Sequence, residues 1–314
     1  MCDMKPTILF MGTPEFAVPS LEILAKNDYH IVGVVTRPNS PRGRGRKYAK
    51  PPVKIAAEEY NIPVIQPERV RDKEFLDTFR KLSPDMVALV AFGQILPKEI
   101  IDFPKMGCIN VHPSLLPRYG GAAPINWTLI RGEETTGVTT ILMDEGMDTG
   151  DILLQEKTAI EPGETFDKLH NRLSKMGADL LLETVEGITK GAVTRTPQDS
   201  TLATYAPPLT KEDGIINWQE GIKDILNLIR GLSPSPCAYT FIKGKKLKIF
   251  TAAGEEAHVT ETAGAIAAKT EKGLRVAAKD GYIYLEELQL EGKKRMSVHD
   301  FLRGYRLSPE DILG

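Results

Sequence analysis

The sequence predicts a two-domain protein, in which an α/β domain with a mostly parallel sheet precedes a smaller β-barrel. At roughly 100–200 residues per domain, a length of 314 residues favours two domains. Short apolar runs alternate with amphipathic runs through the first half, as in a parallel α/β sheet. Beyond Pro208, short strands and turn signals dominate. We expect the first domain over 1–190, a Thr-, Ser- and Pro-rich linker over 191–208, and the barrel over 209–314.

The elements of the first domain follow from the spacing of its apolar residues. Strands are expected at Thr7–Met11, His30–Thr36, Val64–Ile65, Asp85–Ala91, Cys108–His112 and Val138–Met143. Helices are expected at Pro19–Lys26, Pro52–Tyr60, Asp72–Leu82 and Ala123–Arg131, with a long helix after Pro162-Gly163. Met86–Ala91 is apolar throughout, which is typical of a strand covered on both faces. Together these elements predict one continuous α/β domain.

One amphipathic helix and several short strands are predicted after the linker. Ile222, Ile225 and Ile229 share a helix face. In the strand-like run Lys246–Ile249, Lys246 and Lys248 alternate with apolar residues and therefore lie on one face. With Lys245 they suit an OB-like barrel that touches backbone phosphates. A solubilising barrel surface explains any single lysine equally well.

Composition excludes several classes of protein. The net charge of −2 argues against a nucleic-acid binder when the chain is taken as a whole. Cys2, Cys108 and Cys237 lie far apart, so neither a disulfide framework nor a metal site is expected. The chain has neither an apolar run of about 18 residues nor a signal-peptide pattern, so a cytoplasmic protein is expected. No large apolar stripe requires a partner, which favours a monomer.

One segment, Thr36–Lys54, departs from this average neutrality. It holds no acidic residue, and its basic residues are Arg37, Arg42, Arg44, Arg46, Lys47, Lys50 and Lys54. Glycines and prolines interrupt any helix or strand, so the segment is predicted to be an exposed, flexible loop. Alternating arginines and glycines favour an arm that contacts phosphates or bases and orders on binding. A merely solvated loop is the alternative.

The turn after the first predicted strand, Met11-Gly12-Thr13-Pro14, does not match a nucleotide-binding loop. A dinucleotide fingerprint needs three glycines, and a P-loop needs a Lys-Ser/Thr pair. This turn has a single glycine and no such pair. NAD and ATP are therefore poor candidates, and Gly12 is expected to be a turn glycine near the mouth of a site.

Two polar residues are predicted to converge at the end of the strand Cys108–His112. Asn110 and His112 project from the same face of this strand, and Pro113 keeps His112 extended. Open α/β sheets bind ligands at the carboxyl ends of their strands. An amide that donates to an oxyanion and an imidazole that moves a proton or stabilises charge are suited to acyl transfer.

A carboxylate is available in the loop that follows the next strand. Asp148 is flanked by glycines there and can favour and orient a protonated imidazole. Asp144 and Glu145 in the same loop remain alternatives. Each of these residues alone is as easily structural, but three complementary groups at one sheet edge predict an acyl-transfer site. No metal-ligand cluster or serine-nucleophile elbow in the chain competes with this interpretation.

These motifs resemble those of the folate-dependent formyltransferases. Asn110–Pro117, which reads Asn-Val-His-Pro-Ser-Leu-Leu-Pro, and Met147–Gly150, which reads Met-Asp-Thr-Gly, carry the likeness. It continues through Phe10–Ala17, Gly121–Ile125 and the C-terminal domain, over essentially the whole chain. The resemblance implies a Rossmann-like formyltransferase fold with an OB-like second domain, and 10-formyltetrahydrofolate as formyl donor without a metal.

The resemblance also assigns roles to individual residues. It implies a catalytic trio of Asn110, His112 and Asp148. The implied folate contacts are Ser114, Leu115, Leu116 and Pro117, together with Phe92, Gly93 and Gln94. Gly120 departs from the family pattern, because many relatives have an arginine there, so one substrate contact could differ.

Within this superfamily, the basic segment and the second domain resemble the members that formylate methionine on initiator tRNA. The implied activity is formyl transfer to the α-amino group of methionyl initiator tRNA, which gives N-formylmethionyl-tRNA for translation initiation. The implied tRNA contacts are Arg42, Arg44, Arg46 and Lys47, with Arg44 aligned best to the key arginine, besides the three barrel lysines. Two alternatives stay open: a formyltransferase acting on an amino sugar nucleotide, and a non-catalytic RNA-binding protein, which would leave the trio unexplained.

Overall fold

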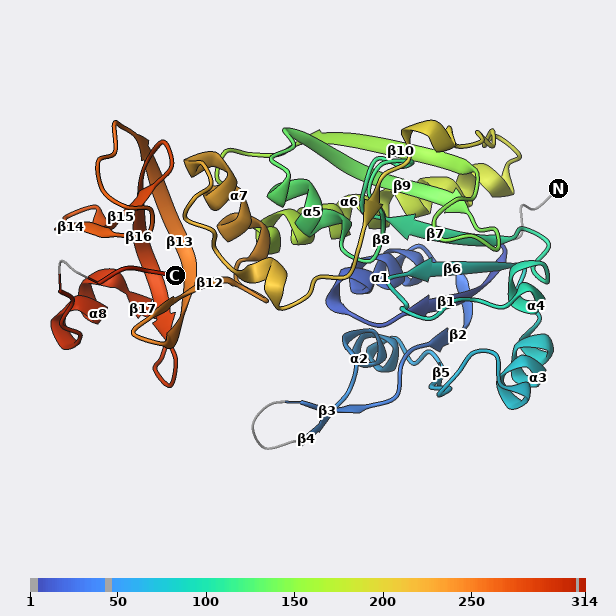
Figure 1. Ribbon diagram of the computed structural model, residues 1–314. Coiled ribbons are helices and arrows are strands. Elements are labelled where there is room, and N and C mark those ends of the chain that lie inside the picture. The colour runs from blue at the N-terminus through green and yellow to red at the C-terminus, as the bar shows by residue number, and fades with distance from the viewer. Residues whose placement is uncertain (1–4, 43–46, 309–310) are drawn as a thin grey trace. The chain divides into compact units, whose positions relative to one another are not determined.

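The computed structural model describes residues 5–42, 47–308 and 311–314. Its contacts divide the chain into two compact units (Figure 1). The first unit comprises Met1–Gly121, Thr136–Thr158 and His170–Ala206. The second comprises Ala122–Thr135, Ala159–Leu169 and Pro207–Gly314. Each unit has its own sheet and its own hydrophobic core.

The first unit is built on a seven-stranded sheet with the strand order β10-β9-β7-β6-β1-β2-β5. The strands are β1 (Thr7–Gly12), β2 (His30–Val35), β5 (Val64–Ile65), β6 (Met86–Val90), β7 (Cys108–His112), β9 (Thr135–Leu142) and β10 (Ile152–Ala159). Strands β1, β2, β5, β6 and β7 are parallel, and β9 runs antiparallel to β7. The predicted mostly parallel sheet is confirmed. Strand β10 was not predicted, because its second half is polar and largely exposed.

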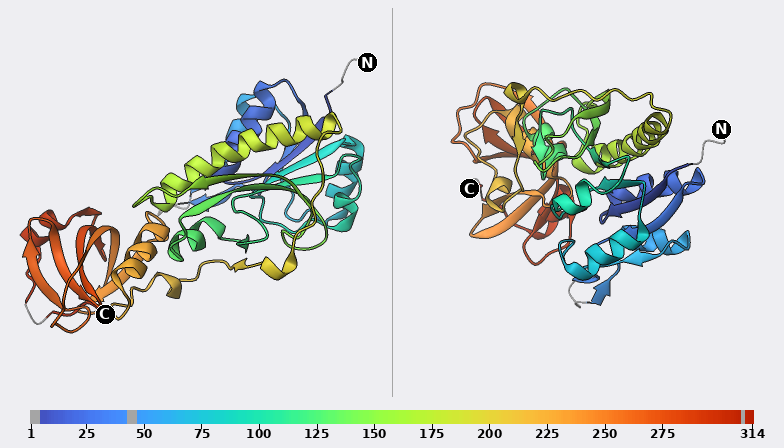
Figure 2. Two further views of the ribbon diagram at one scale, coloured as in Figure 1. Left: turned by 90° about the horizontal axis from the view of Figure 1, so that it is seen from above. Right: turned by 90° about the vertical axis from the view of Figure 1, so that its right-hand side faces the viewer.

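Helices cover both faces of this sheet. They are α1 (Val18–Lys26), α2 (Pro52–Glu59), α3 (Lys73–Leu82), α4 (Lys98–Ile101) and α6 (Phe166–Thr189), with a short 3-10 helix η1 (Glu15–Ala17). Figure 2 shows α6 running along one face, where the Ser174 hydroxyl donates to the Phe16 carbonyl at 2.7 Å. On the other face, Phe79 of α3 and Ile100 of α4 share a buried cluster with Leu9 of β1. Burial on both faces explains why β6 is apolar throughout.

The basic segment contains two strands, and the prediction that no strand forms there is wrong. Strands β3 (Ser40–Arg42) and β4 (Lys47–Ala49) pair antiparallel in a hairpin that extends away from the large sheet (Figure 1). Pro41 is tolerated because both strands of a two-stranded ribbon are edge strands, where a missing N–H need not break a ladder. Arg44 and Arg46 lie outside the described residues.

The second unit combines a five-strand antiparallel path, β12-β13-β16-β15-β14, with β17 paired to β16. Its elements are α5 (Pro124–Ile130), η3 (Glu212–Gly214), α7 (Ile222–Leu232), β12 (Ala238–Ile242), β13 (Lys245–Glu256), β14 (Ile266–Thr270), β15 (Gly273–Ala278), β16 (Gly281–Leu290), β17 (Met296–Ser297) and α8 (Val298–Gly304). The predicted helix is present, and the predicted short strands form an antiparallel sheet. Closure of this sheet into an OB-like barrel remains a prediction.

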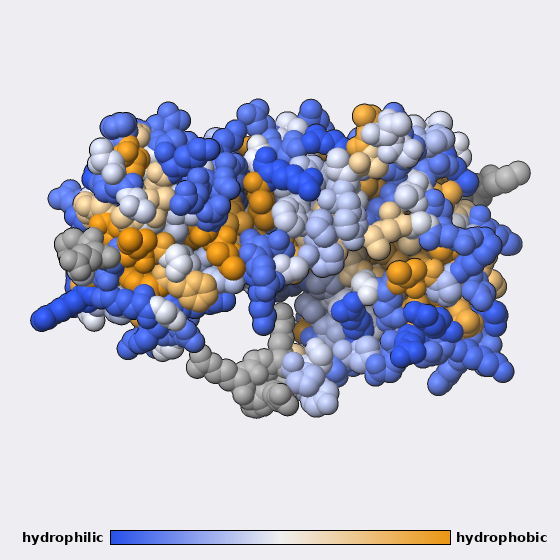
Figure 3. All heavy atoms as spheres, viewed as in Figure 1, coloured by the Kyte–Doolittle hydropathy of each residue, from blue (hydrophilic) through white to orange (hydrophobic). Residues whose placement is uncertain are grey.

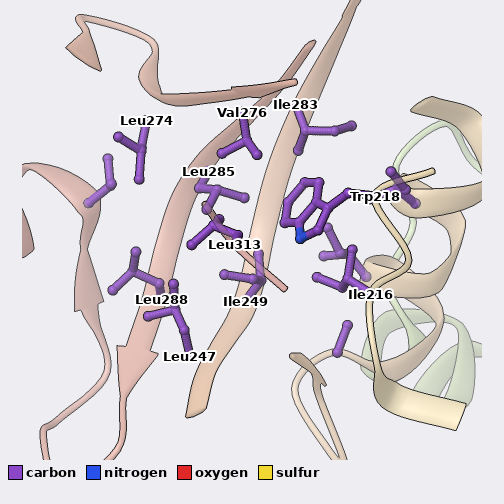
Figure 4. Packing of buried hydrophobic residues seen from close by; sticks show 14 of the residues in the cluster. Ile216, Trp218, Leu247, Ile249, Leu274, Val276, Ile283, Leu285, Leu288 and Leu313 are labelled. Carbon is purple, nitrogen blue, oxygen red and sulfur yellow. The ribbon is translucent and has the colours of Figure 1, made fainter. Parts of the chain in front are cut away.

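Trp218 lies in the core of the second unit. Its indole packs among apolar side chains of the sheet, including Ile249 and Ile283 (Figure 4). The indole Nε1 donates to the Thr240 hydroxyl at 3.1 Å, which satisfies the polar end of a side chain that is 4% exposed. Trp218 therefore joins the segment before α7 to the sheet.

Hydrophilic side chains cover most of the face drawn in Figure 3, with hydrophobic residues in scattered patches. Within the described part of the chain, no helix is both long and apolar enough to cross a membrane.

Replacement of Trp218 tests this core. Trp218→Ala removes a buried aromatic ring and should lower the free energy of unfolding by about 3–5 kcal/mol, measured by urea denaturation with circular dichroism. Leu202→Ala, at a side chain that is 60% exposed, is the control and should change little. An unfolding free energy for Trp218→Ala within about 1 kcal/mol of the parent would contradict the packing described here.

Candidate active site

The carboxyl ends of β1, β6 and β7 meet at one edge of the sheet. Gly12 at the end of β1 pairs with Val90 at the end of β6, and Val90 pairs with Val111 of β7. The turns that follow these strands therefore surround one site, where open α/β sheets bind their ligands. Asn110 and His112 stand on β7 at this edge, as the sequence predicted.

Both ring nitrogens of His112 face acceptors. The Nε2 atom lies 2.9 Å from the carbonyl oxygen of Tyr119, which can only accept, so Nε2 carries a proton in this contact. The Nδ1 atom lies 3.5 Å from Oδ2 of Asp148. The residue is 4% exposed, so both contacts are shielded from solvent. An imidazolium can donate to both acceptors, whereas a neutral ring can donate to only one.

Asp148 joins the two residues of β7 to the next turn. Its Oδ1 accepts from Nδ2 of Asn110 at 3.2 Å, and its Oδ2 accepts from the backbone N–H of Gly121 at 2.8 Å. Its side chain is 14% exposed. The structure thus brings Asn110, His112 and Asp148 together around one carboxylate.

The two alternative carboxylates of this loop lie elsewhere. Asp144 accepts hydrogen bonds from the Gly146 N–H and the Thr149 hydroxyl and so closes its own turn. Glu145 is 68% exposed and pairs with Lys98. Neither carboxylate contacts the His112 ring, which leaves Asp148 as the acidic partner.

Cys108 shares the strand and the face of Asn110 but has no nucleophilic character. Its Sγ donates to the Ile100 carbonyl at 3.4 Å. Burial, assisted by the nearby Asp102 charge, raises the pKa of this thiol to about 12. The thiol therefore stays protonated at neutral pH, and thiolate chemistry at this strand is excluded.

A polar contribution from residues 196–206 was missed by the sequence analysis. Gln198 donates through Nε2 to the carbonyls of Asp148 and Gly150. Thr204 accepts from the Tyr119 N–H at 2.8 Å. The composition of this stretch is typical of a linker. Its hydrogen bonds reach residues 50 and 85 positions earlier, and such distant contacts leave no pattern in the local sequence.

The residues expected to contact folate divide into buried and accessible ones. Ser114, Leu116 and Phe92 are buried, and the Ser114 hydroxyl donates to the Arg118 carbonyl at 2.7 Å. The other four are partly or fully accessible: Leu115, Pro117, Gly93 and Gln94. Beside them lies Ile95, which the sequence analysis did not select and which is 77% exposed.

The candidate tRNA contacts fall on both units. In the first unit, Arg42 ends β3 and Lys47 begins β4. In the second, Lys245 is exposed, the Lys246 ammonium lies 3.4 Å from the centre of the Tyr239 ring, and the Lys248 ammonium donates to the Pro236 carbonyl at 3.4 Å. Their apolar neighbours Leu247 and Ile249 are fully buried, which confirms the predicted alternation.

Space is available at Gly120, where the sequence departs from the family pattern. A Cβ atom there would lie 3.7 Å from Cβ of Asp148 and 3.8 Å from Cδ2 of Leu116, which are ordinary contact distances. A longer side chain at this position would therefore lie next to Asp148. Over residues 5–42, 47–308 and 311–314, no group of three or more His, Cys, Asp or Glu side chains is placed to hold a metal ion.

Comparison with known proteins gives consistent matches over both parts of the chain. The family model described as "Formyl transferase" matches residues 4–185, and the model "Formyl transferase, C-terminal domain" matches residues 208–306. A methionyl-tRNA formyltransferase of Syntrophus aciditrophicus (strain SB) is 58% identical over 310 residues, which cover 99% of this chain and 99% of that protein.

Solved structures share the fold at lower identity. The N-formyltransferase of Helicobacter canadensis, in complex with folinic acid and dTDP-3-aminofucose, matches with a TM-score of 0.65 at 20% identity, over 93% of this chain and 100% of that one. HypX of Aquifex aeolicus, in complex with tetrahydrofolic acid, matches with a TM-score of 0.64 at 16% identity, over 95% of this chain and 47% of that one.

Tight packing of the Asp148 loop gives a prediction. A Cβ atom at Gly150 would collide with the carbonyl oxygen of Leu142. Because such overpacking costs about 1–3 kcal/mol, Gly150→Ala should lower the melting temperature in differential scanning fluorimetry by several degrees. Gly304→Ala is the matched control, since a Cβ there has no neighbour within 4 Å. Equal melting temperatures for the two variants would show that the loop does not need this close approach.

Proposed function

Because the chain belongs to the methionyl-tRNA formyltransferase family, we propose that it transfers a formyl group to the α-amino group of methionyl initiator tRNA. The formyl donor is 10-formyltetrahydrofolate, and the product is N-formylmethionyl-tRNA. The observation that carries the proposal is the buried cluster of Asn110, His112 and Asp148 at the carboxyl edge of the sheet. These groups are suited to acyl transfer without a metal or a covalent enzyme intermediate.

The proposed mechanism is direct attack of the methionyl amine on the formyl carbon. The new carbon–nitrogen bond forms as the carbonyl electron pair moves to oxygen. A proton then passes from the attacking nitrogen to N10 of the folate, and the bond between the formyl carbon and N10 breaks as the oxyanion re-forms the carbonyl. Asn110 stabilises the oxyanion by donating a hydrogen bond, and protonated His112 stabilises it by its positive charge. One N–H of the Asn110 amide points to Asp148, and the second remains to donate to the oxyanion. Asp148 holds the ring of His112 through the contact between its Oδ2 and Nδ1 of the ring.

We assign supporting roles to the remaining candidate residues. Ser114, Leu115, Leu116 and Pro117, with Phe92, Gly93 and Gln94, form the folate-binding wall. In this wall, buried Ser114, Leu116 and Phe92 shape the surface, and the accessible members make the contact.

The tRNA contacts lie in two groups of basic residues. The acceptor stem is contacted by Arg42, Arg44, Arg46 and Lys47, and the tRNA backbone is contacted by Lys245, Lys246 and Lys248. Support comes from the basic residues gathered in the hairpin segment and from the shared strand face of Lys246 and Lys248.

We extend the proposal to the organisation of the whole chain. Residues 1–190 form the catalytic domain, 191–208 the linker and 209–314 an OB-like tRNA-binding domain. The enzyme acts as a monomer in the cytoplasm. In this proposal, the second unit binds the RNA that carries the amine.

A direct assay tests the function. The protein is incubated with 10-formyltetrahydrofolate and with charged initiator tRNA, charged elongator tRNA or an amino sugar nucleotide, and the formylated product is identified. We expect formylation of the charged initiator tRNA. Formylation of the sugar nucleotide alone, or of nothing, would contradict the proposal.

The trio is tested in the same assay. Loss of one oxyanion-stabilising group typically costs about 100- to 1000-fold in turnover. His112→Ala and Asp148→Ala should therefore lose at least about 100-fold in turnover while still binding tRNA. Glu145→Gln is the matched control, because this exposed carboxylate of the same loop pairs with Lys98 and should be dispensable. Near-normal turnover in either trio variant would remove that residue from the mechanism.

The basic hairpin is tested through the salt dependence of tRNA binding. Contacts to phosphates release counterions, so the joint replacement of Arg42, Arg44, Arg46 and Lys47 by alanine should raise the KM for tRNA and flatten the slope of log affinity against log salt. The control removes the same number of positive charges from the exposed residues Arg71, Lys73, Arg80 and Lys81. An unchanged slope in the hairpin variant, or an equal change in the control, would contradict the role of the hairpin.

A further inference from the structure

Residues 196–206 form a strap across the loops that hold His112 and Asp148. At one end, Thr196 exchanges two backbone hydrogen bonds with Ile152, of 2.8 and 2.9 Å. At the other end, β11 (Tyr205–Ala206) pairs in parallel with β8 (Gly120–Gly121). Strand β8 in turn supplies the N–H of Gly121 that donates to the Asp148 carboxylate. The strap is therefore attached to both sides of the site.

Gln198 fixes the backbone that carries Asp148. Its Nε2 donates to the Asp148 carbonyl at 2.8 Å and to the Gly150 carbonyl at 2.7 Å, so one amide holds the chain on both sides of Thr149. Asp148 has a φ of 56°, a left-handed backbone conformation that residues other than glycine seldom adopt. Such a conformation persists only where surrounding contacts impose it, and the two Gln198 hydrogen bonds are contacts of that kind.

Thr204 fixes the loop that supports His112. Its hydroxyl accepts from the Tyr119 N–H at 2.8 Å, and its carbonyl accepts from the Gly120 N–H at 3.0 Å. Tyr119 is also left-handed, with a φ of 60°. The carbonyl of this same residue accepts from Nε2 of His112. Thr204 therefore controls where the acceptor of the His112 ring lies.

We propose that Gln198 and Thr204 are positioning residues for formyl transfer. Gln198 sets the direction of the Asp148 carboxylate, and Thr204 sets the Tyr119 carbonyl, so the two residues together orient His112. The rate predictions of this proposal rest on the proposed function. A misplacement of a reacting group by about 1 Å can cost roughly 100-fold in rate. Substitution of Gln198 or Thr204 should therefore lower kcat and leave the affinity for tRNA unchanged.

Steady-state kinetics with charged initiator tRNA test the proposal. Gln198→Ala and Thr204→Val should each lower kcat by about 10- to 100-fold and change the KM for tRNA by less than about threefold. Thr204→Ser keeps the hydroxyl and should restore kcat to near the parent value. Thr201→Ala is the matched control, because that hydroxyl donates only to Asp199 within the strap. It should retain the parent kcat.

A second measurement separates this proposal from the proposed function. The ¹⁵N chemical shifts of the His112 ring report its hydrogen bonds whether or not the protein formylates tRNA, and His112→Ala identifies the signals. They should move in Gln198→Ala and Thr204→Val and stay fixed in Thr201→Ala. Unmoved ring signals in the first two variants, or a kcat within about threefold of the parent in both, would overturn the positioning role. An inactive parent whose ring signals still respond to the strap would contradict the function alone.

Discussion

The Asp148 carboxylate accepts hydrogen bonds from the Gly121 N–H and the Asn110 amide, and it faces Nδ1 of His112. The end of β7, the strand β8 and the loop after β9 thus meet at one largely buried charge. A buried carboxylate is costly unless donors surround it, so each of these contacts compensates for the loss of solvent. The turn at β8, the end of β7 and the loop after β9 must therefore be correctly placed at the same time.

The sheet makes this convergence possible. Alternation along β7 puts Asn110 and His112 on one face, while Val111 between them packs near Gly177 of α6 on the other. Parallel pairing of β7 with β6 fixes where β7 ends. Parallel pairing of β6 with β1 places the turns after these two strands beside it. The reactive groups are carried by a buried strand, and the loop after β9 brings the charge that orients them. This division suits a reaction that depends on the placement of an oxyanion.

The parts that could be predicted from sequence are those with a local signal. The apolar run of β6, the Asn-x-His spacing on β7 and the glycines around Asp148 each lie within a few residues. The contacts of Gln198 and Thr204 could not be predicted, because hydrogen bonds to carbonyls and amides far along the chain impose no pattern on residue type. Strand β10 was not predicted, because the polar run of Gln155, Glu156 and Lys157 interrupts the alternation of apolar and polar residues. The hairpin β3–β4 was not predicted, because Pro41 argues against a central strand. In an isolated two-stranded ribbon, however, a proline is tolerated.

A double-mutant cycle measures most directly whether Asp148 works through His112. Single-turnover rates of formyl transfer are compared for the parent, His112→Ala, Asp148→Ala and the double variant. If the carboxylate acts by holding the imidazole, removing the carboxylate should change the rate little in a variant that already lacks the imidazole. The double variant should then be within about threefold of His112→Ala. A rate loss in the double variant equal to the product of the two single losses would contradict this account.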